Sequence, residues 1–93
     1  MNSYRLNRTN RQTGFKMIAT CVEVNGVFTL KAGSTISPIE LKGLSKRIKT
    51  LRDSVKYDSN HAIVEDITFN SLYDAACFVI GTNASDKRFV KTN

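Results

Sequence analysis

The sequence has few of the residue types on which catalysis and metal binding depend. Its 93 residues include one histidine, two cysteines and no tryptophan. A structural zinc site needs about four Cys or His ligands, whereas Cys21, His61 and Cys77 are only three and are widely scattered. Ser34 is not part of a GxSxG motif, and His61 is the only imidazole that could act as its base. We therefore expect a protein that is not an enzyme and that holds no metal or cofactor.

Long apolar segments are also absent. No run of about 18 apolar residues occurs, so we expect no membrane-spanning helix and no membrane partner. The first residues are basic, but no apolar segment follows them, so we expect no signal peptide. Cys21 and Cys77 are then expected to be reduced, buried thiols, because disulfides are rare inside cells. These features together predict a cytoplasmic protein.

Charge of one sign is present in excess. Fourteen Lys and Arg residues stand against eight Asp and Glu residues, which gives a net charge of +6. Such a surplus favours an anionic partner. Nucleic acids, acidic protein surfaces and membrane headgroups all carry negative charge, and of these we expect a nucleic acid or an acidic protein and not a membrane. A chain of this length forms one domain.

The first fifteen residues differ from the rest of the chain. They contain Arg5, Arg8 and Arg11, no acidic residue, and no helical pattern of apolar residues. We expect residues 1–15 to form a basic flexible arm and residues 16–93 to form a single α+β domain. The alternative is that the arm is a solvated tail without a function.

Within the predicted domain, a β-hairpin is the clearest local signal. The segments 16–24 and 27–31 are rich in β-branched and apolar residues, and Asn25-Gly26 separates them. This dipeptide tolerates the positive φ angles of a type I′ turn. A third strand is expected over residues 61–69, and 88–90 can add a short edge strand.

Two helices are expected after the hairpin. Pro38, capped by Ser37, begins a segment with an apolar stripe that predicts a helix to residue 53. Ser71 caps a second, mostly apolar helix, and Gly81 ends it. The predicted order is ββαβα, with an antiparallel or mixed sheet packed on two helices.

Several cations are candidates for contact with phosphate. Lys42, Lys46 and Lys49 recur along one flank of the first predicted helix, where they form either a solvated face or a ligand-binding one. Tyr4 and Tyr57 lie in polar segments where they could stack on bases, whereas Tyr73 is expected in the core. The candidate phosphate contacts are Arg5, Arg8, Arg11, Lys42, Lys46, Lys49 and Lys87.

Three segments taken in order resemble a known family. They are GVFTLKAGS at 26–34, the basic segment that follows, and EDITFNSLYDAACFVIG at 65–81. They resemble the small domain of unknown function, related to the RAMA domain, that is found at the C-termini of GIY-YIG nucleases and in restriction–modification proteins. The matching positions are Gly26, Phe28, Gly33, Ser34, Asp66, Phe69, Ser71, Ala75, Ala76, Gly81 and Lys91.

The resemblance implies a module that engages DNA and that usually accompanies a catalytic domain. Lys87 and Val90 replace the aromatic residues near the end of the family pattern, which argues against recognition of modified bases. The sequence carries no catalytic signature, so the chain is either a fragment or a free-standing member. A free-standing basic member would suit a phage or a mobile element.

Two functions from different classes therefore remain. The favoured one is a non-catalytic DNA-binding accessory module that contacts mainly the phosphate backbone, although the sequence does not decide between DNA and RNA. The other is a small protein-interaction module or inhibitor, of the phage or mobile-element type, that binds a host nuclease or another nucleic-acid-binding protein. Oligomeric state is left open by the sequence.

Overall fold

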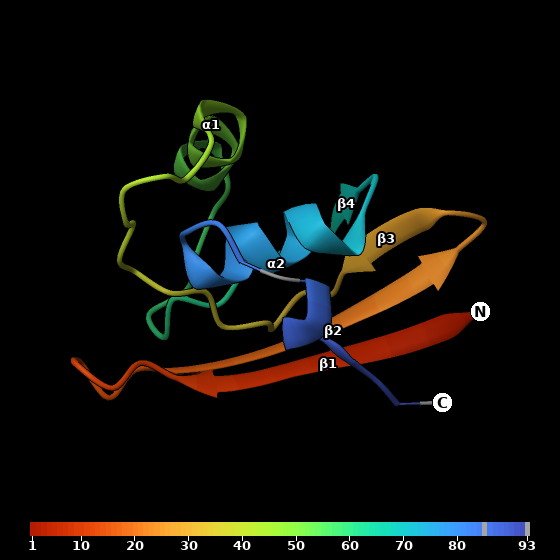
Figure 1. The fold of residues 1–93 in the computed structure, drawn as a ribbon, viewed down its shortest axis with the longest axis horizontal. Helices are drawn as coiled ribbons and strands as arrows, with labels where there is room; N and C mark the ends of the chain where they lie inside the picture. Colours follow the sequence, from red (N-terminus) through yellow and green to blue (C-terminus); the bar gives the residue numbers. More distant parts are fainter. Residues whose placement is uncertain (85, 93) are drawn as a thin grey trace.

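The structure is a computed structural model that describes residues 1–84 and 86–92. These residues form β1 (Asn2–Thr9), β2 (Lys16–Val24), β3 (Val27–Leu30), α1 (Lys46–Ser54), β4 (Ile67–Phe69), α2 (Leu72–Ile80), the 3₁₀ helix η1 (Asp86–Arg88) and β5 (Val90–Lys91). The strands make one antiparallel sheet in the order β4-β3-β2-β1-β5. Figure 1 shows α2 lying across one face of this sheet, with α1 on the far side of α2. The expected α+β class is confirmed.

A tight turn sets the register between β2 and β3. Asn25 and Gly26 have φ angles of 52° and 80°, the positive values that a type I′ turn requires. The Glu23 carboxylate accepts a hydrogen bond of 2.7 Å from the Gly26 amide and closes the turn. The predicted hairpin is therefore confirmed.

The first residues of the chain form strand β1. This strand pairs antiparallel with β2 along its whole length, and its Leu6 side chain is only 1% exposed. The expectation of a flexible arm at residues 1–15 is therefore wrong. In the part of the chain that the structure describes, helices cover one face of the sheet, so the outward positions of β1 are polar. The apolar residues of β1 are therefore too few to show a pattern.

The third predicted strand is shorter than expected. The sequence predicts a strand over residues 61–69, but only the three residues of β4 pair with β3. Ala62 and Ile63 make isolated bridges instead. His61 has a φ of 60°, a left-handed conformation that regular strands do not contain. The conformation of His61 therefore excludes it from a strand, and bends at residues 64 and 65 separate the two bridges from β4.

Strand β5 lies later in the chain than predicted. Residues 86–88 form η1, so β5 begins at Val90 and pairs with β1 only at Tyr4 and Arg5. Within the described part of the chain, positions 6–9 of β1 consequently have no strand neighbour on that side. This stretch is a free sheet edge, whose backbone groups are open to pairing.

Helix α1 begins later than its predicted start at Pro38. Its N-cap is Ser45, whose hydroxyl accepts a hydrogen bond of 3.3 Å from the Ile48 amide. Gly43 has a φ of 97°, a left-handed conformation that interrupts a right-handed helix. The expectation that Ser37 caps this helix is therefore wrong.

Helix α2 matches its prediction. Ser71 caps it by accepting a hydrogen bond of 3.1 Å from the Asp74 amide. Gly81, with a φ of 84°, ends it in the left-handed conformation. Phe78 is fully buried, and its ring lies 5.5 Å from that of Phe69 on β4 and 5.9 Å from the Arg52 guanidinium of α1. Tyr73 does not lie in the core as expected, because 45% of this residue is exposed.

Both cysteines lie among the buried residues as free thiols. Cys21 is on β2 and Cys77 is on α2. Burial raises the pKa of the Cys21 thiol to about 11, so this group stays protonated at neutral pH. The core cluster consists of Leu6, Met17, Ala19, Cys21, Leu30, Ile36, Ile48, Ile63, Phe69, Ala75, Ala76, Phe78, Val79 and Phe89.

Candidate nucleic-acid interface

Side chains of β1 alternate between the two faces of the sheet. Leu6 points toward α2 and is buried in the core. Arg8, two residues further, lies on this same face, whereas Arg5 lies on the opposite face. Arg5 and Arg8 therefore lie on opposite faces of the sheet.

A turn after β1 gives Arg11 a defined position close to Arg8. The Asn10 side-chain oxygen accepts hydrogen bonds from the amides of Gln12, at 2.8 Å, and Thr13, at 3.2 Å. Asn side chains favour such turns because they replace a backbone acceptor. The backbone that carries Arg11 is therefore fixed although its side chain is exposed.

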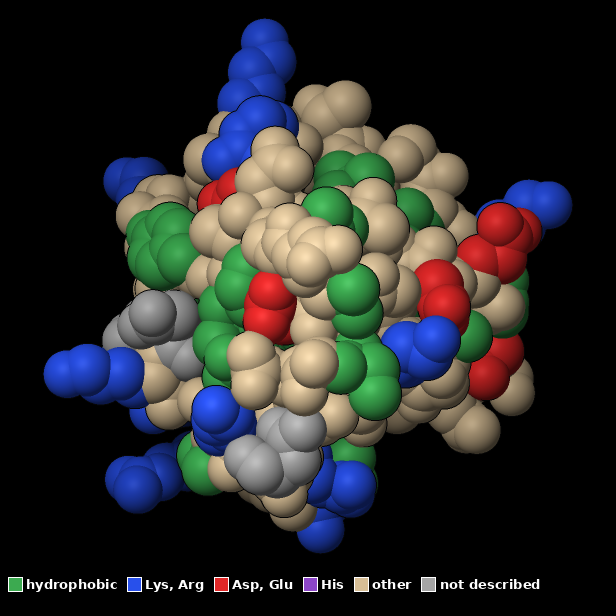
Figure 2. Space-filling view, turned by 90° about the vertical axis from the view of Figure 1, so that its right-hand side faces the viewer, with side chains coloured by type: hydrophobic (Ala, Val, Ile, Leu, Met, Phe, Trp, Pro, Cys, Tyr) green, Lys and Arg blue, Asp and Glu red, His purple; other side chains and the backbone are tan. Residues whose placement is uncertain are grey.

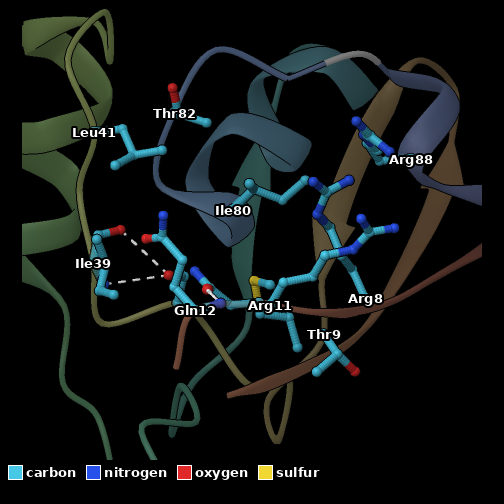
Figure 3. Close-up of a pocket in the computed structure, with 12 residues that line it drawn as sticks. Arg8, Thr9, Arg11, Gln12, Ile39, Leu41, Ile80, Thr82 and Arg88 are labelled. Carbon is cyan, nitrogen blue, oxygen red and sulfur yellow. Dashed lines mark hydrogen bonds between the residues drawn. The ribbon is translucent and has the colours of Figure 1, made fainter. Parts of the chain in front are cut away.

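Arg8 and Arg11 meet a third arginine, Arg88, around a pocket of about 670 Å³. The end of β1, the loop before α1, the end of α2 and η1 all contribute to its wall. Figure 3 shows the three arginines on one side of the pocket, and Ile39 and Leu41 on the other. The remaining lining residues are Thr9, Asn10, Gln12, Met17, Ser37, Ile80 and Thr82.

The loop that carries Ile39 and Leu41 is tied to the end of α2. The Leu41 amide donates a hydrogen bond of 2.9 Å to the Gly81 carbonyl, and the Ser37 amide donates one of 2.9 Å to the Val79 carbonyl. Carbonyls at a helix C-terminus have no partner within the helix, and these bonds satisfy them. The apolar side of the pocket is therefore held in place by the fold.

The cations of α1 are largely neutralised by carboxylates. The Lys49 Nζ lies 2.9 Å from a Glu40 oxygen and 3.3 Å from an Asp53 oxygen. An Arg47 nitrogen lies 3.1 Å from an Asp74 oxygen. A phosphate that approached these cations would have to compete with carboxylates already in contact, so this flank is a weak candidate for anion binding.

The paired carboxylates keep their charge at neutral pH. Hydrogen bonds, first from Lys49 and then from Arg52, lower the pKa of the Glu40 carboxyl below its ordinary value. The Lys31 ammonium, 2.7 Å away, lowers the pKa of the Asp66 carboxyl in the same way. These carboxylates are therefore ion-paired with cations that lie outside the pocket.

The pocket itself has no such neutralisation. Its lining includes no Asp or Glu. Among the residues that the structure describes, no ion pair involves Arg8, Arg11 or Arg88. Three guanidinium groups around one pocket repel one another, and an anion placed among them relieves this repulsion. The anion also accepts charge-assisted hydrogen bonds from the planar guanidinium groups, whose geometry suits phosphate. The arrangement is therefore that of an anion site.

The predicted phosphate contacts do not share one surface. Arg8 and Arg11 line the pocket, Arg5 lies on the opposite face of the sheet, and Lys49 is ion-paired. The others, which are exposed and do not line the pocket, are Lys42, Lys46 and Lys87. In Figure 2 cationic side chains project at several separate places, at the top, toward the lower left and at the right, where most of the acidic side chains of this view also lie. The positive charge is therefore divided among several surfaces.

Arg88 is the site residue that sequence reasoning missed. It was expected to begin an edge strand, and nothing in the local sequence relates it to Arg8 and Arg11, which lie about 80 residues earlier. The only signal was its place in a basic tail beside Lys87. The pairing of β5 with β1 brings this tail back beside the first strand, and only the folded topology shows it.

The remaining polar candidates have structural roles. The His61 Nδ1 lies 2.7 Å from the Ile36 carbonyl oxygen, and its ring stacks on Tyr57 with centroids 4.2 Å apart. The Tyr57 hydroxyl donates a hydrogen bond of 2.8 Å to the Arg52 carbonyl. One face of the Tyr57 ring is therefore covered by His61, and its hydroxyl is already bonded. Within the described residues, no three His, Cys, Asp or Glu side chains are grouped as metal ligands would be.

Comparisons with known proteins return no relative. No family model, no curated protein and no solved structure matches this chain. Neither α1 nor α2, nor any other helix of the described residues, has the length and apolarity needed to cross a membrane.

Proposed function

We propose that this protein is a non-catalytic accessory module that binds DNA, mainly through phosphate contacts made by Arg8, Arg11 and Arg88. The observation that carries the proposal is the acid-free pocket in which these three arginines lie. Arginine is the residue best suited to bidentate contact with phosphate oxygens. The net charge of +6 adds a long-range attraction for polyanions.

The proposed binding rests on charge rather than on base recognition. Neither helix presents an unpaired row of polar side chains of the kind that reads a major groove, since α2 is buried and several polar residues of α1 are ion-paired. We expect an affinity on the order of 10⁻⁴–10⁻⁶ M at physiological salt. The resemblance to RAMA-like domains supports a role beside nucleases or restriction–modification proteins in the cytoplasm.

Fluorescence anisotropy with labelled DNA tests the proposal. For about three phosphate contacts we expect log Kd to rise with log salt concentration with a slope of about 2 to 3. Arg8→Ala/Arg88→Ala should weaken binding far more than Arg5→Ala/Lys46→Ala, which removes the same charge away from the pocket. Absence of binding at low salt would overturn the function. Equal losses in the two double variants would instead assign binding to net charge and not to the pocket.

A second function, binding to an acidic segment of a host nuclease or similar protein, is favoured by one specific observation. Positions 6–9 of β1 form a free sheet edge next to the pocket, and an extended peptide can add to such an edge. A nuclease-treated pull-down that retains one stoichiometric partner, and that loses it in Arg8→Ala/Arg88→Ala, would support this function. If the protein retains nucleic acid in the untreated lysate and no protein partner after nuclease treatment, the DNA-binding function is supported instead.

A further inference from the structure

The pocket has two chemically different halves. The cationic half consists of Arg8, Arg11 and Arg88. The apolar half includes Ile39 and Leu41, which Figure 3 places across the pocket from the arginines. A site that only tracked a phosphate backbone would need the cations alone, so the apolar half calls for a ligand with an uncharged part.

The size of the pocket fits a ligand larger than a phosphate group. A volume of about 670 Å³ lies within the range of about 300–1,000 Å³ that is typical of small-molecule and cofactor sites. Gln12 and Thr82 lie beside the apolar half in Figure 3. Their amide and hydroxyl groups can donate and accept hydrogen bonds, as the edge of a nucleobase requires.

The cationic half favours a terminal phosphate over an internal one. A phosphodiester carries one negative charge, whereas a phosphomonoester carries about 1.5 to 2 at neutral pH and has one more free oxygen. Three arginines that share one pocket without a carboxylate among its lining residues are neutralised best by the more highly charged group. A single-stranded end also presents its base without the unpairing that a nucleotide inside a duplex requires.

We propose that this pocket binds the terminal nucleotide of a nucleic acid strand, with the phosphomonoester on Arg8, Arg11 and Arg88 and the base against Ile39 and Leu41. This inference rests on the proposed function and names the part of the nucleic acid that enters the same site. A strand end that carries a phosphate and a free mononucleotide present the same chemical group, a nucleoside monophosphate. The experiment below distinguishes these two ligands.

Anisotropy titrations of one short single-stranded DNA in three forms test this proposal. The forms carry a 5′-phosphate, a 3′-phosphate or no terminal phosphate, and the label is internal in each. We expect at least one phosphorylated form to bind about tenfold more tightly than the unphosphorylated form, the gain of one charge-assisted contact. A free mononucleotide should compete with that form.

Two variants separate the halves of the pocket. Arg8→Ala/Arg88→Ala should abolish the difference between the phosphorylated and unphosphorylated strands. Leu41→Ala should weaken binding of the phosphorylated strand several-fold. It should not change the concentration of inorganic phosphate that is needed to displace this strand from the arginines. Leu41 is exposed, so this variant keeps its fold, which circular dichroism checks.

The outcomes distinguish this inference from the function on which it rests. If all three strands bind equally and Arg8→Ala/Arg88→Ala weakens them equally, the protein binds nucleic acid but the terminal-nucleotide inference is wrong. If no strand binds while a mononucleotide raises the melting temperature, the ligand is a free nucleotide and both proposals fail. Preference for a phosphorylated strand that is lost in the double variant supports both.

Discussion

Arg52 joins three separate parts of the fold through a single side chain. Only 4% of this residue is exposed, and its guanidinium donates hydrogen bonds to the carbonyls of Phe78 and Ser37. Its Nε also lies 3.0 Å from a Glu40 oxygen. Arg52 therefore ties α1 to the end of α2 and to the loop that forms the apolar side of the pocket.

Replacement of Arg52 should be strongly destabilising. In Arg52→Met the two buried carbonyls lose their donor and the Glu40 carboxylate loses a partner, so we expect a loss of about 3 kcal/mol in the free energy of unfolding. Urea denaturation followed by circular dichroism measures it. Arg47→Met, which removes an exposed cation from the same helix, is the matched control and should change stability little. Equal effects of the two substitutions would contradict the structural role of Arg52.

Glu40 should make stability depend on pH in the acid range. Its pKa is lowered in the folded protein, chiefly by the hydrogen bond from Lys49 and next by Arg52. The stability that this carboxylate contributes is therefore present above its ordinary pKa of 4.5 and is lost as pH falls through the lowered value. Glu40→Gln should be less stable than the wild type at pH 7, and the gap should narrow below pH 4.5. A gap that stays constant down to acid denaturation would refute this assignment.

At the scale of whole elements, local signals predicted those segments whose ends are set by their own residues. The hairpin follows from Asn25-Gly26, and α2 follows from Ser71 and Gly81. The start of α1 could not be predicted in this way. Ser37 and Pro38 resemble a helix start, and the apolar stripe begins at Leu41, but the Ser37 and Leu41 amides bond to the end of α2. A tertiary contact of this kind overrides local propensity.

Gly81 is required for both its conformation and its lack of a side chain. A Cβ at this position would collide with the Ile39 carbonyl oxygen, and the φ of 84° is unfavourable for other residues. Gly81→Ala should therefore lower stability by more than Gly26→Ala, which shares a similar φ of 80° but has no atom within 4 Å of the added Cβ. We expect the free energy of unfolding to fall by about 1 kcal/mol in the control, Gly26→Ala, and by at least twice that in Gly81→Ala. Thermal unfolding of both variants provides the comparison, and equal melting temperatures would show that the collision is absent.

For the molecule as a whole, two of the three pocket arginines could be named from the sequence, but neither could be placed correctly. Arg8 and Arg11 were expected on a flexible arm, and Arg88 was not recognised, because the pocket forms only when β5 returns the tail to the first strand. Net charge indicated an anionic partner. It could not show that many of the cations of α1 are already paired with carboxylates.

Removal of residues 1–9 should disrupt the entire fold. Strand β1 lies between β2 and β5 and supplies Leu6 to the core, so the truncated chain loses a strand from the interior of the sheet. We expect loss of cooperative thermal unfolding and of dispersed NMR signals. Arg5→Ala, at an outward position of the same strand, is the control and should fold normally. A truncated chain that unfolds at the wild-type temperature would restore the flexible-arm interpretation.

The two-residue period of β1 makes ligand binding a measure of correct strand pairing. Leu6 and Arg8 occupy the same face, so a slip of β1 by one residue against β2 would turn both outward and bring Arg5 and Asn7 inward. Such a misaligned molecule would lose its core and the proposed anion site together. If the proposed ligand binds, a preparation that binds it stoichiometrically therefore also has β1 in the correct register.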